Sequence, residues 1–200
     1  MRIELSERTL QPVHVRLEYP EAGVARARKI DKDLPDENTY ARIRDVDFHN
    51  GTIELDVRGG LLPDAPDYAR GFIGLVFRAS AADSEFESFY IRPTNGRDCA
   101  DPVRRAHGCQ YFSYPGYTFS YFREFDITGY ERAVDSIALD QWSHIRVDIQ
   151  DAAARFWVDG AQVLEVRGMK HGADARGGVG LYVDIGTDGF FRNLEITCRD

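Results

Sequence analysis

Hydrophobic and polar residues alternate along much of the chain, which is the pattern of strands that bury one face. Ile53, Leu55 and Val57 share one side of a segment whose intervening residues are charged. The segments 144–149 and 155–158 repeat this pattern, with their apolar side chains predicted inside. Sustained helical spacing is nearly absent. The sequence therefore predicts an all-β protein of about a dozen short antiparallel strands.

One segment, 72–77, is apolar on both sides, which predicts a strand in the middle of a sheet that is covered on both faces. Turn dipeptides such as Asn50-Gly51 separate the strands. The segments 61–70 and 94–108 are predicted to be loops, and long loops on a rigid sandwich often carry function. We find no internal repeat or shift in composition, so residues 1–200 are expected to form one domain.

The composition bounds the classes of partner. The chain has 200 residues, 43% of them hydrophobic, which is enough to bury a substantial core. Its net charge of -8 argues against nucleic acid and anionic membrane surfaces as partners. The start lacks the apolar region of a secretory leader, so the sequence as given predicts a cytoplasmic protein, or a secreted or periplasmic one if a leader was removed. The oligomeric state is left open.

The three cysteines match no zinc-binding spacing. Cys198 alternates with Leu194 and Ile196, so we expect it to be a buried free thiol. Cys99 and Cys109 flank one loop and form a disulfide only in the secreted case; reduced thiols are the default expectation.

Several motifs carry a resemblance to known families. The segment 142–166 resembles the late hairpins of laminin G-like domains. An ordered set of motifs over roughly residues 24–197 is similar to the bacterial family of 3-keto-disaccharide hydrolases: Phe48-His49-Asn50-Gly51-Thr52-Ile53-Glu54, Gly71-Phe72-Ile73-Gly74-Leu75-Val76-Phe77-Arg78, Phe89-Tyr90-Ile91-Arg92-Pro93, Gln110-Tyr111 and Gly189-Phe190-Phe191-Arg192-Asn193-Leu194. The stretch 93–97 and the aromatic run after Gln110 depart from that family and imply a subgroup with a different substrate.

The resemblance implies a two-sheet antiparallel jelly-roll sandwich of the concanavalin A-like type and a function in handling carbohydrate. That fold hosts lectins, hydrolases and lyases alike, so the resemblance favours no single mechanism.

A saccharide site is predicted on the open concave face of one sheet. If Phe89 and Ile91 point into the core, alternation places Tyr90 and Arg92 on the opposite face. Aromatic rings stack on the C–H faces of sugars, and arginine or amide donors fix the hydroxyl groups. Later strands and the loop 94–108 complete the predicted substrate-binding set, which is Tyr90, Arg92, Asn95, Arg105, Gln110, Tyr121 and Arg123. The alternative is a structural pair, Tyr90 with Arg92, under aromatic residues that simply cover the sheet.

The sequence offers no clear pair of catalytic carboxyl groups. Laminarinase-like hydrolases on this fold place Glu-x-Asp-x-Glu on one strand. Here Arg58 occupies the position of the last glutamate after Glu54 and Asp56, which disfavours their mechanism. These three residues are interpreted as a solvated strand face. The remaining catalytic candidates are Glu87, His107 and Glu131. Whether the protein is an enzyme is left open; if it is one, we expect a glycoside hydrolase or polysaccharide lyase.

No cofactor is expected. Asp184, Asp188 and the carbonyl groups near Gly186 are the residues that could bind a structural calcium ion, but a plain turn is the favoured interpretation. Three functions follow in order of preference: saccharide binding, sugar hydrolysis or elimination in the same cleft, and protein interaction.

Overall fold

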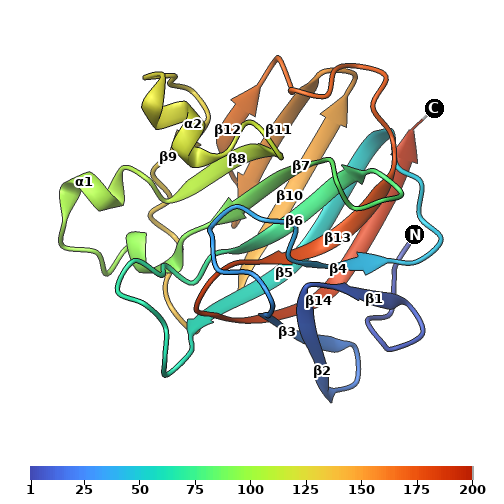
Figure 1. The fold of residues 1–200 in the computed structure, drawn as a ribbon, viewed down its shortest axis with the longest axis horizontal. Helices are drawn as coiled ribbons and strands as arrows, with labels where there is room; N and C mark the ends of the chain where they lie inside the picture. Colours follow the sequence, from blue (N-terminus) through green and yellow to red (C-terminus); the bar gives the residue numbers. More distant parts are fainter. Residues whose placement is uncertain (200) are drawn as a thin grey trace.

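The computed structural model describes residues 1–199 as two antiparallel seven-stranded sheets packed face to face (Figure 1). The first sheet has the order β1 (Leu10–Val13), β4 (Tyr40–Ile43), β13 (Gly178–Val183), β6 (Ile73–Ala79), β7 (Phe86–Ile91), β8 (Cys109–Tyr114), β9 (Glu131–Arg132). The second has the order β12 (Ala161–Val166), β11 (Ala153–Val158), β10 (Ser143–Gln150), β5 (Asn50–Leu61), β14 (Thr187–Arg199), β3 (Val24–Lys29), β2 (Val15–Glu21). The predicted all-β sandwich is confirmed.

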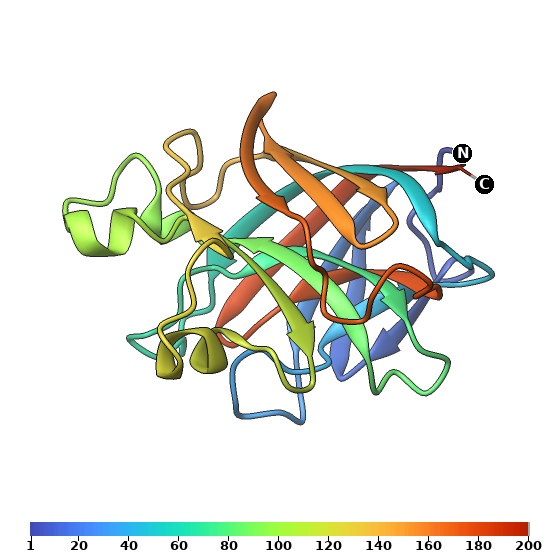
Figure 2. The ribbon, with the colours of Figure 1, turned by 90° about the horizontal axis from the view of Figure 1, so that it is seen from above.

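Helical structure is confined to short segments: α1 (Pro102–Arg105), α2 (Phe119–Glu124) and a 3₁₀ turn over Pro93–Asn95. Figures 1 and 2 show α1 and α2 at one end of the sandwich, and the two chain termini lie together at the other end. The amino group of Met1 donates to the carbonyl of Ile196, which holds the N-terminus against β14. None of the described helices is long and apolar enough to cross a membrane.

The predicted alternation places the core between the sheets. In β10 and over residues 52–58 of β5 the apolar residues are buried and the charged residues between them are partly or fully exposed. Phe89 of β7 stacks on Phe156 of β11 with ring centroids 4.4 Å apart, so the odd-numbered side of β7 faces the second sheet. Every residue of β6 is buried, and β6 is the fourth of seven strands, as its apolar sequence predicted.

The other face of the first sheet carries a second buried layer, which is aromatic. Its members are Tyr40, Phe86, Tyr90, Phe112 and Tyr182, each at most 1% exposed and in ring contact with at least one other member. The segment 30–39 crosses in front of this face (Figure 1). We call these five residues the outer aromatic layer. Burial of both faces explains why the strands β13, β6 and β7 in the middle of the sheet have no exposed residue.

The structure contradicts the prediction that Tyr121 and Arg123 lie on strands. Strand β8 ends at Tyr114, and after a Pro-Gly turn residues 119–124 form α2. The helical segment buries Phe122, which stacks on Tyr130 at 4.3 Å. A single buried position in so short a segment leaves no readable periodicity, and aromatic residues favour strands when taken alone.

The cysteine predictions are partly contradicted. Cys198 is exposed, because β14 continues past the core and pairs there with Gly51, which has no side chain to cover the thiol. Cys99 and Cys109 are buried free thiols.

The outer aromatic layer depends on glycine in β13. A Cβ atom at Gly180 would lie 2.4 Å from the Tyr40 ring, so we expect Gly180→Ala to destabilise the protein by about 1–3 kcal/mol through overpacking. Gly116→Ala is the matched control, because an added Cβ there meets nothing within 4 Å. Urea unfolding of both variants measures the difference, and equal stabilities would contradict the packing described here.

Candidate functional site

A pocket of about 260 Å³ opens at the end of the sandwich that carries the two helices. It lies where the outer aromatic layer meets the segments that cover it. Its lining comes from the covering segment 30–39, the loop between β5 and β6, β7, the loop after β7 with α1, and α2. The residues are Pro35, Asp36, Tyr68, Arg70, Phe72, Tyr90, Arg92, Asn95, Val103, Arg104, His107, Phe119 and Arg123.

Aromatic rings form part of the wall. Phe72 and Tyr90 meet edge to face with centroids 5.8 Å apart. Phe119 contributes from the first residue of α2, and Tyr68, which is 52% exposed, stands on the loop after β5. Partly exposed rings next to polar groups suit a ligand that has apolar faces and hydroxyl edges.

Arg92 is the central polar group and is only 4% exposed. Its guanidinium donates to the Tyr90 hydroxyl at 3.1 Å, to the side-chain oxygen of Gln110, to the His107 carbonyl at 3.2 Å and to Glu131 Oε2 at 3.3 Å. Four acceptors hold the planar group in one orientation. Arg92 is therefore a fixed donor at the wall of the pocket.

Glu131 of β9 lies beside two arginines and a histidine at this wall. Besides Arg92, it lies 3.9 Å from Arg123 Nη2, and its Oε1 is 2.9 Å from His107 Nδ1 without the alignment of a hydrogen bond. Arg123 also lies over the Phe119 ring, 5.5 Å from its centroid. One carboxylate thus serves a cluster that carries more positive than negative charge.

Helix α1 positions Arg104. The carboxylate of Asp101 accepts from the backbone N–H groups of Val103 at 2.9 Å and Arg104 at 3.4 Å, which caps the start of the helix. The Arg104 guanidinium then reaches Thr94 Oγ1 at 3.1 Å and Asn95 Oδ1 at 3.4 Å. Asn95 in turn donates to the His107 carbonyl at 3.0 Å, so the two loop segments are joined at the pocket.

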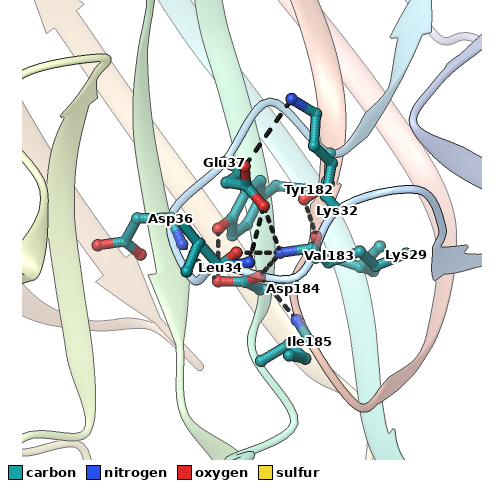
Figure 3. A network of polar contacts seen from close by, with 10 residues as sticks. Lys29, Lys32, Leu34, Asp36, Glu37, Tyr182, Val183, Asp184 and Ile185 are labelled. Atoms are coloured by element: carbon teal, nitrogen blue, oxygen red, sulfur yellow. Dashed lines mark hydrogen bonds and ion pairs between the residues drawn. The ribbon is translucent and has the colours of Figure 1, made fainter.

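The covering segment 30–39 is anchored by Asp184, which is 1% exposed (Figure 3). Asp184 accepts from Lys29 Nζ at 2.7 Å, from the backbone N–H of Asp36 at 2.7 Å and from the Tyr182 hydroxyl at 3.1 Å. Lys29 also lies 3.4 Å from Glu37. These contacts tie the segment to the end of β13 and fix the position of Asp36.

Asp36 places a second buried carboxyl group in the pocket wall. Figure 3 shows its carboxyl group directed away from that of Asp184, and its Oδ2 accepts from the backbone N–H of Phe119 at 2.7 Å. Burial, with a smaller contribution from the negative charge of Asp184, raises the pKa of Asp36 to about 7. The group therefore changes its charge near neutral pH.

The proposed calcium residues do not fit a calcium site. The oxygens of Asp184 are taken by the ammonium and N–H donors already described, and Asp188 pairs with Arg26 at 2.7 Å. Within residues 1–199 no group of three or more histidine, cysteine or acidic side chains is placed to hold a metal ion.

The structure brings most of the predicted site residues together. Tyr90, Arg92, Asn95, His107 and Arg123 line the pocket. Behind Arg92 lie its partners Gln110 and Glu131, which complete this set. The prediction that Tyr90 and Arg92 face an open sheet surface is wrong: alternation gave the correct face, but covering segments bury both side chains.

Three predicted residues lie outside the pocket. Arg105 pairs with Asp135 at 2.9 Å, and Tyr121 packs on Tyr117, 5.1 Å between centroids. Glu87 is fully buried on the core side of β7, where it accepts from the backbone N–H of His171 at 2.8 Å and from the Tyr111 hydroxyl. Through these hydrogen bonds Glu87 links β7 to the segment after β12, which is a structural role.

Sequence reasoning missed other residues of the pocket. They come from segments without periodicity: Pro35 and Asp36, Tyr68 and Arg70, Val103 and Arg104, and Phe119. The sequence did contain one signal for these residues, which was the presence of aromatic side chains in polar, proline-containing loops. An exposed loop gains no solubility from an aromatic ring, so a ring there points to packing or ligand binding. Phe72 was interpreted only as core.

The fold matches those of several solved structures. A carbohydrate-binding module, CBM66, from Bacillus subtilis has a TM-score of 0.62 at 12% identity, over 93% of both chains. A Bacillus subtilis protein of unknown function with a galectin-like fold has a TM-score of 0.57 at 11% identity, over 100% of both chains. A putative glycosyl hydrolase from Parabacteroides distasonis has a TM-score of 0.55 at 15% identity, over 98% of this chain and 92% of the other.

These matches confirm the two-sheet jelly-roll fold. At sequence identities this low they show similarity in fold and nothing more. No family model and no curated protein matches the chain. The similarity to 3-keto-disaccharide hydrolases stays a prediction.

Asp36 makes stability depend on pH. Between its ordinary value of 3.8 and about 7, the folded protein holds a proton that the unfolded chain releases, so the free energy of unfolding falls as pH rises. We expect Asp36→Asn to remove this fall and to be more stable than wild type above pH 7, by on the order of a few kcal/mol.

Chemical unfolding at pH 5 and pH 8 measures the effect. The exposed Asp174→Asn is the matched control and should follow wild type. The quantity to compare is the difference in free energy of unfolding between wild type and Asp36→Asn. If this difference is the same at pH 5 and pH 8, Asp36 is not buried as a neutral acid.

Proposed function

We propose that the pocket binds a saccharide. The observation that carries this proposal is the combination of partly exposed rings with a fixed donor, Arg92, in one enclosed pocket. Rings offer faces to the C–H groups of a sugar, while guanidinium and amide groups offer directed hydrogen bonds to hydroxyl groups. The similarity in fold to a carbohydrate-binding module supports the same class of ligand.

A pocket also favours a small ligand over a protein partner. The outer aromatic layer is buried under the covering segment 30–39, so it does not offer the flat apolar patch that protein interaction would use. What remains accessible is a pocket of about 260 Å³, which suits a few sugar units at most.

Tyr68 gives the cleanest test, because its exposed ring can be removed without opening the core. We expect Tyr68→Ala to weaken binding of a saccharide ligand about tenfold, the loss of roughly one stacking contact. Calorimetric titration with an oligosaccharide panel measures this, and melting temperatures confirm folding. Tyr19→Ala, on β2 of the second sheet, is the control and should bind normally. The absence of heat with every saccharide tested would overturn the proposal.

A second candidate, sugar hydrolysis in the same pocket, is favoured by Asp36. A general acid must carry its proton at neutral pH, and a carboxyl group whose pKa is raised to about 7 is partly protonated there. Glu131, behind His107 and Arg92, is the other carboxyl group of the cluster. A glycosidase uses two carboxyl groups, one of them as the general acid.

Release of reducing sugar from a disaccharide and polysaccharide panel tests this candidate. If turnover occurs, we expect Asp36→Asn to lower kcat by at least about 100-fold, the range that general acids contribute. Asp174→Asn should leave kcat unchanged. Turnover that survives Asp36→Asn would remove Asp36 as the acid, and binding without any turnover would leave saccharide binding alone.

A further inference from the structure

Positive charge gathers in the pocket although the protein is acidic. The chain carries a net charge of -8, yet four arginines line this one pocket. They come from four different parts of the fold. Arg70 lies in the loop before β6, Arg92 at the end of β7, Arg104 in α1 and Arg123 in α2. The one carboxyl group in the lining, Asp36, is partly protonated near neutral pH.

Two of these arginines lack a counter-charge. Arg70 Nη1 donates to the carbonyls of Asp67 and Ala69, both at 2.7 Å, and Arg104 contacts only the neutral Thr94 and Asn95 side chains. Within residues 1–199 neither arginine forms an ion pair with a carboxylate. Arg92 and Arg123, by contrast, share Glu131.

The arginines also repel one another. Partial burial lowers the pKa of Arg70, and the charges of Arg104 and Arg92 lower it further. Like charges held together at a half-buried site cost stability unless an anion offsets them. Of the eighteen arginines outside the pocket in residues 1–199, nine form ion pairs, such as Arg26 with Asp188 and Arg42 with Asp83. In the pocket four arginines come together and Glu131 pairs with only two of them, so two guanidinium groups that are unpaired within residues 1–199 line the place where a ligand would enter.

We propose that the pocket selects an acidic saccharide, one whose carboxylate or sulfate group lies against Arg70 and Arg104. This inference rests on the proposed saccharide function and specifies its ligand class. A guanidinium group binds two oxygens of a carboxylate or of a sulfate through two parallel N–H donors, whereas a hydroxyl group offers a single oxygen and no charge. Arg92 and Arg123 already pair with Glu131, so the anion is assigned to the two arginines that are free of acids.

Calorimetric titration of the full chain with matched oligosaccharides tests this inference. Each set has one sugar backbone in three forms: neutral, with a carboxylate at C6, or with a sulfate at C6. We expect one acidic form to bind at least about tenfold more tightly than the neutral form, with a preference that weakens as ionic strength rises. The carboxylate and sulfate arms distinguish the two sources of negative charge.

Variants localise the effect. Arg70→Gln and Arg104→Gln should each lower the ratio of acidic-form to neutral-form affinity most of the way to one. Arg155→Gln, an exposed residue of β11 on the second sheet, makes the same change in net charge and should keep the preference. Two independent pocket variants keep the test decisive if one of them folds poorly, as judged by its melting temperature.

The outcomes separate the two proposals. Equal binding of neutral and acidic forms, or an acidic preference that both pocket variants retain, overturns the inference and leaves saccharide binding in place. No binding of any form overturns saccharide binding itself and the inference with it.

Discussion

The outer aromatic layer sets the main constraint on this structure. A sheet that carries tyrosine and phenylalanine rings on the face turned away from its partner sheet must keep those rings from water, so chain outside the sandwich has to cover them. The segment 30–39 does this, and the buried contact between Lys29 and Asp184 holds it in place. A charged pair in such a setting is costly unless its other polar atoms are satisfied, and the hydroxyl and N–H donors around Asp184 meet that requirement.

The pocket is a result of this covering. Backbone that crosses an apolar face brings its own polar groups with it, and these have to be satisfied at the margin of the covered area. Arg92 and Asp36 lie at that margin, each hydrogen-bonded to a segment distant in sequence. The need to cover the outer aromatic layer therefore also brings directed donors, a titratable acid and exposed rings together in one place. Structural and functional interpretations of Tyr90 and Arg92 are compatible, because both side chains stabilise the cover and form the pocket wall.

The sequence predicted the features that are set by residues close together in the chain, such as strand faces. It missed the contacts between residues that are far apart in the chain. Alternation gave the faces of β5, β10 and β11 and the central position of β6, because each strand repeats its environment every second residue. It also placed Tyr90 on the correct side of β7. It could not show that Asp36 meets Phe119 across 83 positions, since no local pattern encodes that contact. Arg123 reaches the pocket from a helix instead of a strand, so its predicted location at the site was correct although its predicted secondary structure was wrong.

The placement of the chain ends bears on how the protein is handled. Both termini emerge together, at the side of the sandwich remote from α1 and α2. A tag, a fluorophore or a sensor surface attached through either terminus therefore leaves the opening of the pocket facing solution. Immobilised protein would present its arginines to large polymers as freely as to short fragments, so chain length of a glycan can be varied without interference from the support.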